Sequence, residues 1–249
     1  MSEEKQPDLG RRDLLQKGIA AGLALAPGVT LLGPAANAKP IDQPVSGKVR
    51  WGMLVDSNKC TSGCDACVQA CNAEHGLGNE THSRPEQQTQ YIRKVTLKHK
   101  ETGAEHSLPM MCQHCETPPC ADVCPTGASF KRDDGIVLVD RHICIGCRYC
   151  MMACPYKARS FVHETLEDQS PYTPRGKGCV ESCTLCAHRI DLGGVPACAE
   201  ACGMEGNGAI LFGDLNDPNS EIAKAVAEQA STEVRADLGL NTGVRYQGI

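Results

Sequence analysis

The sequence has few of the large apolar side chains that build a conventional protein core. Its 249 residues include only nine aromatic residues: one Trp, five Tyr and three Phe. The length allows one large domain or two small ones. A chain this poor in large apolar residues commonly relies on disulfides or metal centres for stability. The composition therefore directs attention to the groups that could replace a core.

Several motifs that mark particular functions are also missing. The formal net charge is −5 and no Lys/Arg-rich run occurs, which argues against a nucleic-acid partner. Neither GxxxxGK[ST] nor C-x-x-C-H is present, so the sequence offers no such nucleotide loop and no attachment site for c-type haem. No carboxylate pair with a substrate pocket and no nucleophile–base motif stands out. These absences disfavour a catalytic role.

The first 38 residues resemble an export signal. Arg11 and Arg12 precede a moderately apolar stretch that ends in Ala36-Asn37-Ala38, an A-x-A cleavage pattern. Twin arginines before such a stretch predict a twin-arginine (Tat) signal. Export of an already folded protein would let it acquire a cofactor in the reducing cytoplasm. An uncleaved N-terminal anchor is the alternative. After this segment we find no hydrophobic run long enough to cross a membrane.

Cysteine is the residue that the sequence has in abundance. Of seventeen cysteines, sixteen fall into four motifs and Cys179 is left over. The motifs are Cys60, Cys64, Cys67 and Cys71 (motif 1); Cys112, Cys115, Cys120 and Cys124 (motif 2); Cys144, Cys147, Cys150 and Cys154 (motif 3); and Cys183, Cys186, Cys198 and Cys202 (motif 4).

Motif 3 has the spacing of a bacterial ferredoxin. It reads CIGCRYCMMACP, which matches C-x2-C-x2-C-x3-C-P. Three closely spaced thiolates can bind three irons of one cubane cluster, while the fourth cysteine is expected to begin a helix and point to a second cluster. The following Pro155 suits a chain leaving the cluster, and Cys124-Pro125 repeats this feature in motif 2.

Disulfides and zinc are the alternatives for these thiols. Seventeen cysteines so closely spaced would give many competing disulfide pairings, with one thiol left unpaired. Zinc sites typically use two C-x2-C pairs or include His, with one metal for four ligands. The three closely spaced thiols of motif 3 fit a cubane better than they fit either alternative.

An internal repeat predicts a ferredoxin-like fold. Val-Asp stands four residues before the first cysteine both in MLVDSNKC and in IVLVDRHIC, so each motif is expected to follow a short strand. SFKRDDGIVLVD predicts a hairpin that turns at Asp134-Gly135. We expect an α+β fold of two ferredoxin-like (bacterial two-cluster) units with long loops, organised around four cubane clusters.

With these motifs in order, the chain resembles the four-cluster iron–sulfur subunits of membrane-linked respiratory complexes. These subunits serve polysulfide, tetrathionate, dimethyl sulfoxide, nitrite and formate enzymes. The resemblance covers residues 50–215, and CTLCAHRIDLGGVPACAEAC followed by GAILFGDLNDP is its most distinctive part. Within this family the signal and the tail GNGAILFGDLNDPNSEI are most similar to the exported subunit of the sulfite-reductase-associated complex, the DsrO type.

The resemblance implies interleaved ligation of four [4Fe–4S] clusters. Carried over by position, the ligand groups are Cys60, Cys64, Cys67 and Cys202; Cys71, Cys183, Cys186 and Cys198; Cys112, Cys115, Cys120 and Cys154; and Cys124, Cys144, Cys147 and Cys150. Three departures stand out: the x3 spacing at the start of motif 1, the lack of Pro after Cys202, and Cys179, which with Cys183 and Cys186 imitates motif 1. We take Cys179 as a spare buried thiol.

Several histidines and cations lie near the motifs. His75, His114, His142 and His188 are expected to face solvent or form hydrogen bonds rather than bind iron. Cations close to clusters raise their potentials, and five cations flank the motifs: Lys59, Lys131, Arg148, Lys157 and Arg189. Residues 79–108 predict an insertion with a strand at YIRKVTLKH, either a partner surface or a solvated hairpin.

The end of the chain predicts a helix. Ser220 is a candidate N-cap for a helix through about Asp237, with Ile222, Val226 and Val234 on its apolar face. The final NTGVRYQGI gives no clear signal. We therefore divide the chain into a signal (1–38), a four-cluster domain (39–215) and a C-terminal helix and tail (216–249).

The chemistry that this pattern supports is one-electron transfer without catalysis. The resemblance implies a multi-spanning NrfD-type quinone-interacting membrane subunit as one partner, and a c-type cytochrome or a catalytic oxidoreductase subunit as another. The mature chain would then be periplasmic and held at the inner membrane by its partners. The alternatives are the beta subunit of a molybdopterin reductase, a catalytic iron–sulfur oxidoreductase that uses Cys179 or an open cluster, and clusters with a purely structural role.

Overall fold

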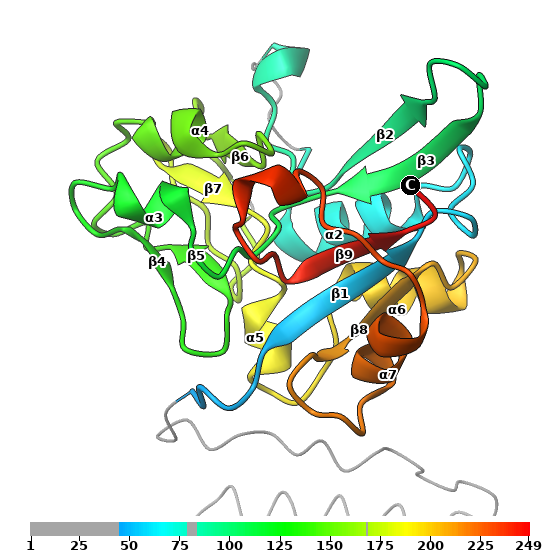
Figure 1. Ribbon diagram of the computed structural model, residues 1–249. Helices are drawn as coiled ribbons and strands as arrows, with labels where there is room; N and C mark the ends of the chain where they lie inside the picture. The colour runs from blue at the N-terminus through cyan, green and yellow to red at the C-terminus, as the bar shows by residue number, and fades with distance from the viewer. Residues whose placement is uncertain (1–44, 79–83, 168) are drawn as a thin grey trace, which may run out of the picture. The chain divides into compact units, whose positions relative to one another are not determined.

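A computed structural model describes residues 45–78, 84–167 and 169–249 (Figure 1). The chain divides into residues 1–36 and 37–249, and all described residues belong to the second part. The predicted signal, residues 1–38, lies outside the described residues. None of the helices among the residues that the structure describes is long and apolar enough to cross a bilayer.

The elements are short and many. In chain order they are β1 (Trp51–Asp56), α2 (Ala66–His75), η1 (Pro85–Gln87), β2 (Arg93–Lys98), β3 (Glu105–Met110), α3 (Pro119–Asp122), β4 (Ser129–Lys131), β5 (Val137–Val139), α4 (Tyr149–Ala153), β6 (Arg159–Phe161), β7 (Val180–Ser182), α5 (Ala187–Ile190), α6 (Ala197–Met204), β8 (Ile210–Asp214), α7 (Glu221–Glu228), η2 (Ala236–Leu238) and β9 (Val244–Gln247). This mixture of helices and small sheets confirms the predicted α+β class.

A three-stranded sheet in the order β8-β1-β9 joins distant parts of the chain. Strand β1 pairs with β8 antiparallel and with β9 parallel. Its residues Met53 and Val55 are fully buried, and Leu54, on the opposite face of the strand, is buried as well. The strand that leads into motif 1 is therefore held between two segments from the C-terminal part of the chain (Figure 1).

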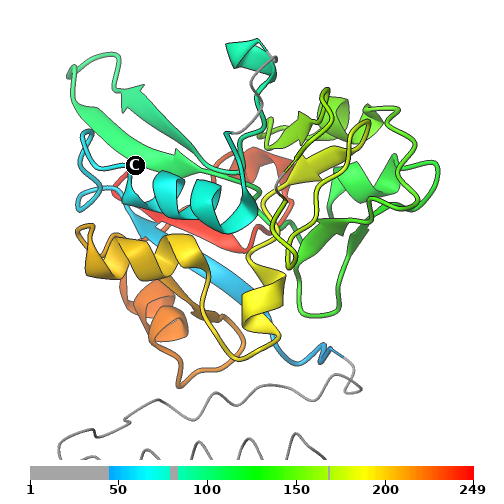
Figure 2. The same ribbon diagram turned by 180° about the vertical axis from the view of Figure 1, so that it is seen from behind.

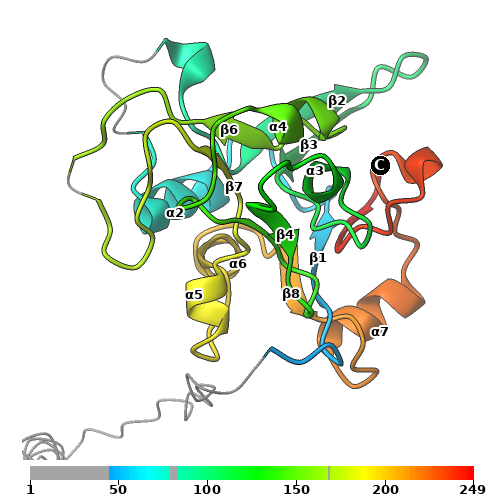
Figure 3. The ribbon, with the colours of Figure 1, turned by 90° about the vertical axis from the view of Figure 1, so that its left-hand side faces the viewer.

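Two pairs of helices carry the cysteine motifs. Helix α2, from motif 1, packs beside α6, from motif 4, and Figure 2 shows the two helices side by side. Helix α3, from motif 2, packs against α4, from motif 3. Figure 3 shows this second pair with the small strands β4 and β6 around it. The first motif is thus brought to the last, and the second to the third.

The predicted hairpin and the predicted strand are both present. Strands β4 and β5 pair antiparallel, and Gly135 lies in the turn between them with φ +87°, in the left-handed region that favours glycine. The run YIRKVTLKH contains β2, which pairs antiparallel with β3. Strands β1 and β5 lead into motifs 1 and 3, as the repeat predicts.

The C-terminal prediction is partly wrong. Ser220 does cap α7, and its Oγ accepts a hydrogen bond from the backbone N–H of Ala223 at 3.1 Å. The helix, however, ends at Glu228 and not near Asp237, because the chain becomes extended at Gln229 and Thr232 forms a bridge with Tyr246. The tail that gave no signal forms β9.

The expected place of the helix within a motif is also wrong. The fourth cysteine does not begin a helix: α4 ends at Ala153 and Cys154 follows it, and α3 ends at Asp122, before Cys124. The third cysteine lies within the helix instead. Pro125 and Pro155 then follow residues that have already left the helix, where a missing N–H costs no helical hydrogen bond.

Candidate metal centres

The structure gathers sixteen of the seventeen cysteines into four groups. All seventeen lie in the described part of the chain and all are free thiols. The groups are site 1 (Cys60, Cys64, Cys67 and Cys202), site 2 (Cys71, Cys183, Cys186 and Cys198), site 3 (Cys112, Cys115, Cys120 and Cys154) and site 4 (Cys124, Cys144, Cys147 and Cys150). These are the groups that the family resemblance implies.

Helix geometry explains how motifs 1 and 4 share their thiols. Cys67 and Cys71 stand one turn apart on α2, and Cys198 and Cys202 stand one turn apart on α6. The two helices pack side by side, so Cys67 meets Cys202 in site 1 while Cys71 meets Cys198 in site 2. Each helix thereby contributes one thiol to each of two neighbouring sites.

Motifs 2 and 3 repeat this arrangement with shorter helices. Cys120 lies in α3 and Cys124 just after it, while Cys150 lies in α4 and Cys154 just after it. Site 3 combines Cys120 with Cys154, and site 4 combines Cys124 with Cys150. The two helix pairs therefore follow one scheme.

The loops between the first two cysteines share a backbone conformation in three motifs. The residue before the second cysteine has positive φ in each: His114 (+44°), Gly146 (+68°) and Leu185 (+53°). Such values are strained for His and Leu and tend to occur at functional sites. Glycine is required at position 146 for a further reason, because a Cβ there would collide with the carbonyl oxygen of Gly178.

Interactions between thiols of different sites place the four sites in a row. Burial raises the pKa of Cys198, and Cys67 of site 1 adds to the rise. Burial likewise raises the pKa of Cys183, with a contribution from Cys112 of site 3. For Cys150 of site 4, burial again raises the pKa, and Cys120 of site 3 contributes. The order is therefore site 1, site 2, site 3, site 4.

Burial differs between the middle and the ends of this row. All eight cysteines of sites 2 and 3 are buried. In site 1, Cys60 and Cys64 are half-buried, and in site 4 Cys147 is exposed while Cys124 and Cys144 are half-buried. The two middle sites are insulated from water, whereas each end reaches the surface.

The thiols surround small hollows and do not meet at one point. Four thiols line a hollow at site 1, and four line another at site 4. No three His, Cys, Asp or Glu side chains within the described ranges converge closely enough to hold one metal ion. A cubane, unlike a single zinc ion, places its four ligands on four separate irons. The arrangement fits clusters.

Two cationic side chains that lie against thiols also indicate clusters. Lys94 Nζ lies 3.0 Å from Cys60 Sγ, and Arg159 Nη2 lies 3.0 Å from Cys120 Sγ. Arg159 is 6% exposed, and its Nη1 is buried without a hydrogen-bond partner. Burial raises the pKa of Cys67 to about 11 and that of Cys112 to about 12. Iron would supply the charge that keeps such thiols ionised, and the thiolates would balance the buried guanidinium.

Sequence reasoning did not identify Lys94 or Arg159. They lie 34 and 39 residues from the cysteines that they contact, so only the fold brings them there. Among the described residues, none of the five flanking cations donates a hydrogen bond to a thiol. Arg189, for example, pairs with Glu200, and Arg148 lies over the Phe161 ring.

The four histidines differ in surroundings. His114 is buried, and its Nδ1 accepts a hydrogen bond from the N–H of Val137 at 3.0 Å. His142 is exposed. His188 pairs with Glu74 at 2.7 Å. His75 is buried, and its Nε2 lies 3.5 Å from Cys186 Sγ. His114, His142 and His188 match the expectation of solvent-facing or hydrogen-bonded histidine, while His75 contacts a thiol of site 2.

Cys179 stands outside the four groups. It is buried, and its Sγ donates to the carbonyl oxygen of Arg141 at 3.3 Å. Burial raises its pKa, and neighbouring Cys144 of site 4 contributes to the rise. Cys179 therefore lies beside site 4 and not beside the thiols of motif 4, which follow it in the sequence.

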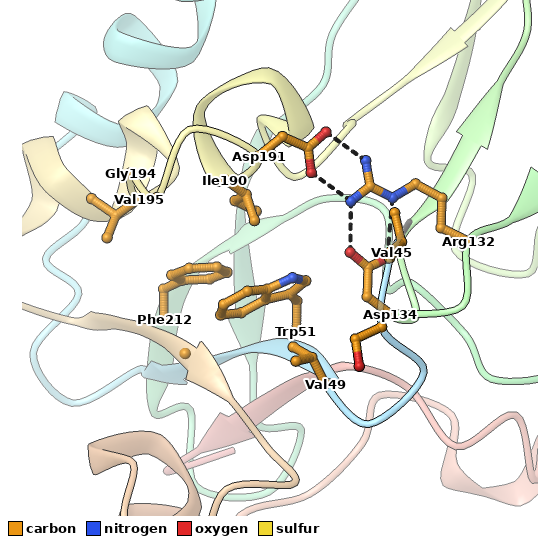
Figure 4. A pocket seen from close by; sticks show the side chains of 13 residues that line it. Val45, Val49, Trp51, Arg132, Asp134, Ile190, Asp191, Gly194, Val195 and Phe212 are labelled. Carbon is orange, nitrogen blue, oxygen red and sulfur yellow. Dashed lines mark hydrogen bonds and ion pairs between the residues drawn. The ribbon is translucent and has the colours of Figure 1, made fainter. Parts of the chain in front are cut away.

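A cavity of about 500 Å³ lies apart from the thiols (Figure 4). The rings of Trp51 and Phe212 stack in it with centroids 5.2 Å apart. Arg132 is held there by Asp134 at 2.6 Å and by Asp191 at 2.7 Å. No cysteine lines this cavity, and its arginine is already matched by two carboxylates. We assign it no part in the redox chemistry.

A buried ion network joins the surroundings of sites 2 and 4. The side chain of Glu181 is 0% exposed and pairs with Arg175 at 2.9 Å and Arg141 at 3.3 Å. Tyr91 donates to the same carboxylate at 3.4 Å, and Arg175 donates to the carbonyl oxygen of Gly76 at the end of α2. The network thus ties β7 to the loop before motif 3 and to the helix of motif 1.

The fold and the four thiol groups define an iron–sulfur protein, and comparison with known proteins identifies the family. A family model described as a 4Fe-4S dicluster domain matches residues 104–214. The chain is 41% identical to the "Hdr-like menaquinol oxidoreductase iron-sulfur subunit 1" of Archaeoglobus fulgidus, covering 94% of this chain and 95% of the relative.

Two further relatives come from bacteria. The chain is 35% identical to a tetrathionate reductase subunit of Salmonella typhimurium, over 97% of this chain and 89% of the relative. It is 36% identical to "Protein NrfC" of Escherichia coli, over 77% of each chain. The chain belongs to this family of iron–sulfur subunits of oxidoreductases, and it carries four [4Fe–4S] clusters.

Loss of charge at Glu181 should destabilise the protein strongly. Glu181→Gln leaves Arg141 and Arg175 without their shared carboxylate, and breaking a buried ion pair costs about 3–5 kcal/mol. We expect the midpoint of anaerobic thermal unfolding to fall by roughly 6–20 °C.

Glu105→Gln is the matched control. Glu105 pairs with Lys98 at 3.3 Å, but its side chain is 57% exposed, so the loss should be at most about 1 kcal/mol. Equal midpoints for the two variants would show that the Glu181 network does not stabilise the fold.

Proposed function

We propose that this chain is the non-catalytic electron-transfer subunit of a membrane-linked respiratory complex. The observation that carries the proposal is the row of four thiol groups with a buried middle and two surface ends. A bound [4Fe–4S] cluster supplies a one-electron carrier. The chain's own residues hold four of them in sequence, keep water from sites 2 and 3, and leave sites 1 and 4 within reach of partners.

We propose that the four thiols of each site bind one cluster, which is the interleaved ligation that the family resemblance implies. The proximity of Cys71 to the thiols of motif 4, and of Cys154 to those of motif 2, supports it. All four positions around each cluster are then occupied by thiolates, which leaves no iron open to substrate. Cys179 is not needed as a ligand. A catalytic role for this chain is disfavoured on the same ground.

The grouping of motifs also supports two ferredoxin-like units. One would contain motifs 1 and 4 with α2, α6 and the sheet β8-β1-β9, and the other motifs 2 and 3 with α3, α4 and the strands β4 to β7. In each unit, the last cysteine of each motif completes the site that the other motif begins. The contact between sites 2 and 3 would be the passage from one unit to the other.

The surfaces at the two ends suit different partners. Around site 4 the exposed side chains include four large apolar ones, Ile143, Ile145 (66% exposed), Tyr149 and Met152, which lie beside the exposed Arg148. Around site 1 the surface carries Lys59 and Lys94. An exposed apolar patch marks an interaction site. We propose that site 4 docks on the NrfD-type quinone-interacting membrane subunit, and that site 1 faces a periplasmic c-type cytochrome or catalytic subunit.

We further propose export by the Tat route and a role in sulfur metabolism, in the complex associated with sulfite reductase. The Arg11-Arg12 signal pattern supports the first part. The likeness of the tail GNGAILFGDLNDPNSEI to the DsrO type supports the second. The beta subunit of a molybdopterin reductase is the competing assignment, and the tetrathionate reductase relative favours it.

Two substitutions one helical turn apart test the ligation. Cys67→Ser should disturb the same electron paramagnetic resonance signal as Cys202→Ser, because these residues share site 1. Cys71→Ser should instead disturb the signal that Cys183→Ser disturbs. Iron and sulfide content of the anaerobically purified wild type should correspond to four cubanes. If Cys67→Ser and Cys71→Ser remove the same signal, the interleaved scheme is wrong.

Co-purification from gently solubilised native membranes tests the partners. Mass spectrometry should find a multi-spanning quinone-type subunit and a c-type cytochrome without a molybdenum subunit. Ile145→Asp should reduce recovery of the membrane subunit at least tenfold, since it places a charge on the apolar patch. Leu192→Asp, at another exposed apolar residue, is the control and should leave recovery unchanged.

Two outcomes would count against this assignment. A molybdopterin subunit in the purified complex would move the chain to the polysulfide, tetrathionate or dimethyl sulfoxide group. Unchanged recovery of the membrane subunit with Ile145→Asp would show that site 4 does not face it.

A further inference from the structure

Arg159 lies between two of the candidate clusters. It is the first residue of β6, and its Nη2 donates to Cys120 Sγ of site 3 at 3.0 Å and to Ser129 Oγ at 2.8 Å. It also interacts electrostatically with Cys112 of site 3 and Cys150 of site 4. The guanidinium therefore acts on thiols of two neighbouring sites at once.

The charge of Arg159 has no carboxylate to balance it. Within the described ranges, no Asp or Glu forms an ion pair with this residue, although it is only 6% exposed. Two other arginines differ in this respect: the half-buried Arg132 is paired with two carboxylates, and the buried Arg175 with Glu181.

An unpaired guanidinium is expensive to bury, and arginine does not escape the cost by losing its proton. The anions within reach of Arg159 are the cysteine thiolates of sites 3 and 4. Ser129 also accepts a hydrogen bond from Arg159, but its hydroxyl carries no charge. The position of Arg159 therefore makes sense for a protein in which these thiols are ionised by iron.

A fixed cation has a definite effect on a neighbouring redox centre. Reduction adds one negative charge, and a cation at hydrogen-bond distance from a ligand sulfur favours the reduced form. Site 2 lacks such a group in the part of the chain described: no Lys or Arg donates a hydrogen bond to its thiols. Arg189 does interact with Cys186, but Glu200 and Glu74 already balance it.

We propose that Arg159 is a positioning residue that raises the reduction potentials of the clusters at sites 3 and 4 together. The inference rests on the proposed electron-transfer function and deepens it. Ser129 holds the guanidinium in place, and β6 fixes it at the boundary between the two sites. Lys94 acts in the same way on site 1 alone, through Cys60. The sites along the row therefore differ in the cationic side chain that acts on their clusters.

Potentiometric titration followed by electron paramagnetic resonance tests this proposal. Arg159→Gln should lower the midpoint potential at site 3 enough to change the reduced-to-oxidised ratio about tenfold at fixed potential, about 59 mV for a one-electron couple. Site 4 should shift in the same direction by less. Sites 1 and 2 should not change. Signals are assigned with the Cys→Ser variants of each site.

Three further variants make the result specific. Arg159→Lys keeps the charge and should remain close to the wild type. Arg132→Gln removes a half-buried arginine that touches no cysteine, and should leave all four midpoints unchanged. Lys94→Met should lower the midpoint at site 1 only. If Arg159→Gln fails to load its clusters, Arg159→Lys decides the matter: retained clusters with wild-type midpoints support the charge, and lost or shifted clusters oppose it.

The proposal would be overturned by an Arg159→Gln protein that binds four clusters with wild-type midpoints. That outcome would leave the electron-transfer function intact, since the clusters would still be present and reducible. A wild-type protein without four reducible clusters would instead contradict the proposed function itself.

Discussion

The structure depends above all on an arrangement in which each thiol site takes three cysteines from one motif and its fourth from another motif. Cysteines one turn apart on a helix face in nearly the same direction, yet each pair is divided between two sites. This is possible because α2 lies beside α6, and α3 beside α4, so that each site is completed by the neighbouring helix. In the proposed ligation, any one cluster requires chain segments that are far apart in sequence. Site 1, for example, joins Cys60 to Cys202. The clusters and the fold then stabilise each other.

This dependence explains how a chain with so few aromatic residues can fold. The cysteines make up a large part of the buried cluster of side chains, alongside ordinary core residues such as Met53 and Leu108. The strands are short, and among the residues that the structure describes the sheets other than β8-β1-β9 have two strands each. Such elements bury little apolar surface by themselves. Without iron the buried thiols would stay protonated, because burial raises their pKa values, and Arg159 would then have no counter-charge among the described residues.

The sequence predicted the parts of the molecule that local spacing determines. The α+β class, the hairpin at Asp134-Gly135 and the cap at Ser220 each follow from a few neighbouring residues, and each is present. Two predictions failed where longer-range contacts compete. The last helix stops at Glu228, before Thr232 pairs with Tyr246, and in motifs 2 and 3 the fourth cysteine follows the helix and reaches the neighbouring site. Lys94 and Arg159 could not be identified, since nothing near them in sequence marks them.

The row of sites, insulated in the middle and exposed at both ends, is the central claim. Iron anomalous scattering from anaerobically grown crystals tests it most directly, because it locates iron independently of any assumed ligand. The account predicts four separate iron peaks in the order site 1, site 2, site 3, site 4, each surrounded by the four thiols of one site and with Arg159 between the last two. Fewer than four peaks, or a peak bound by thiols from two different sites, would contradict it.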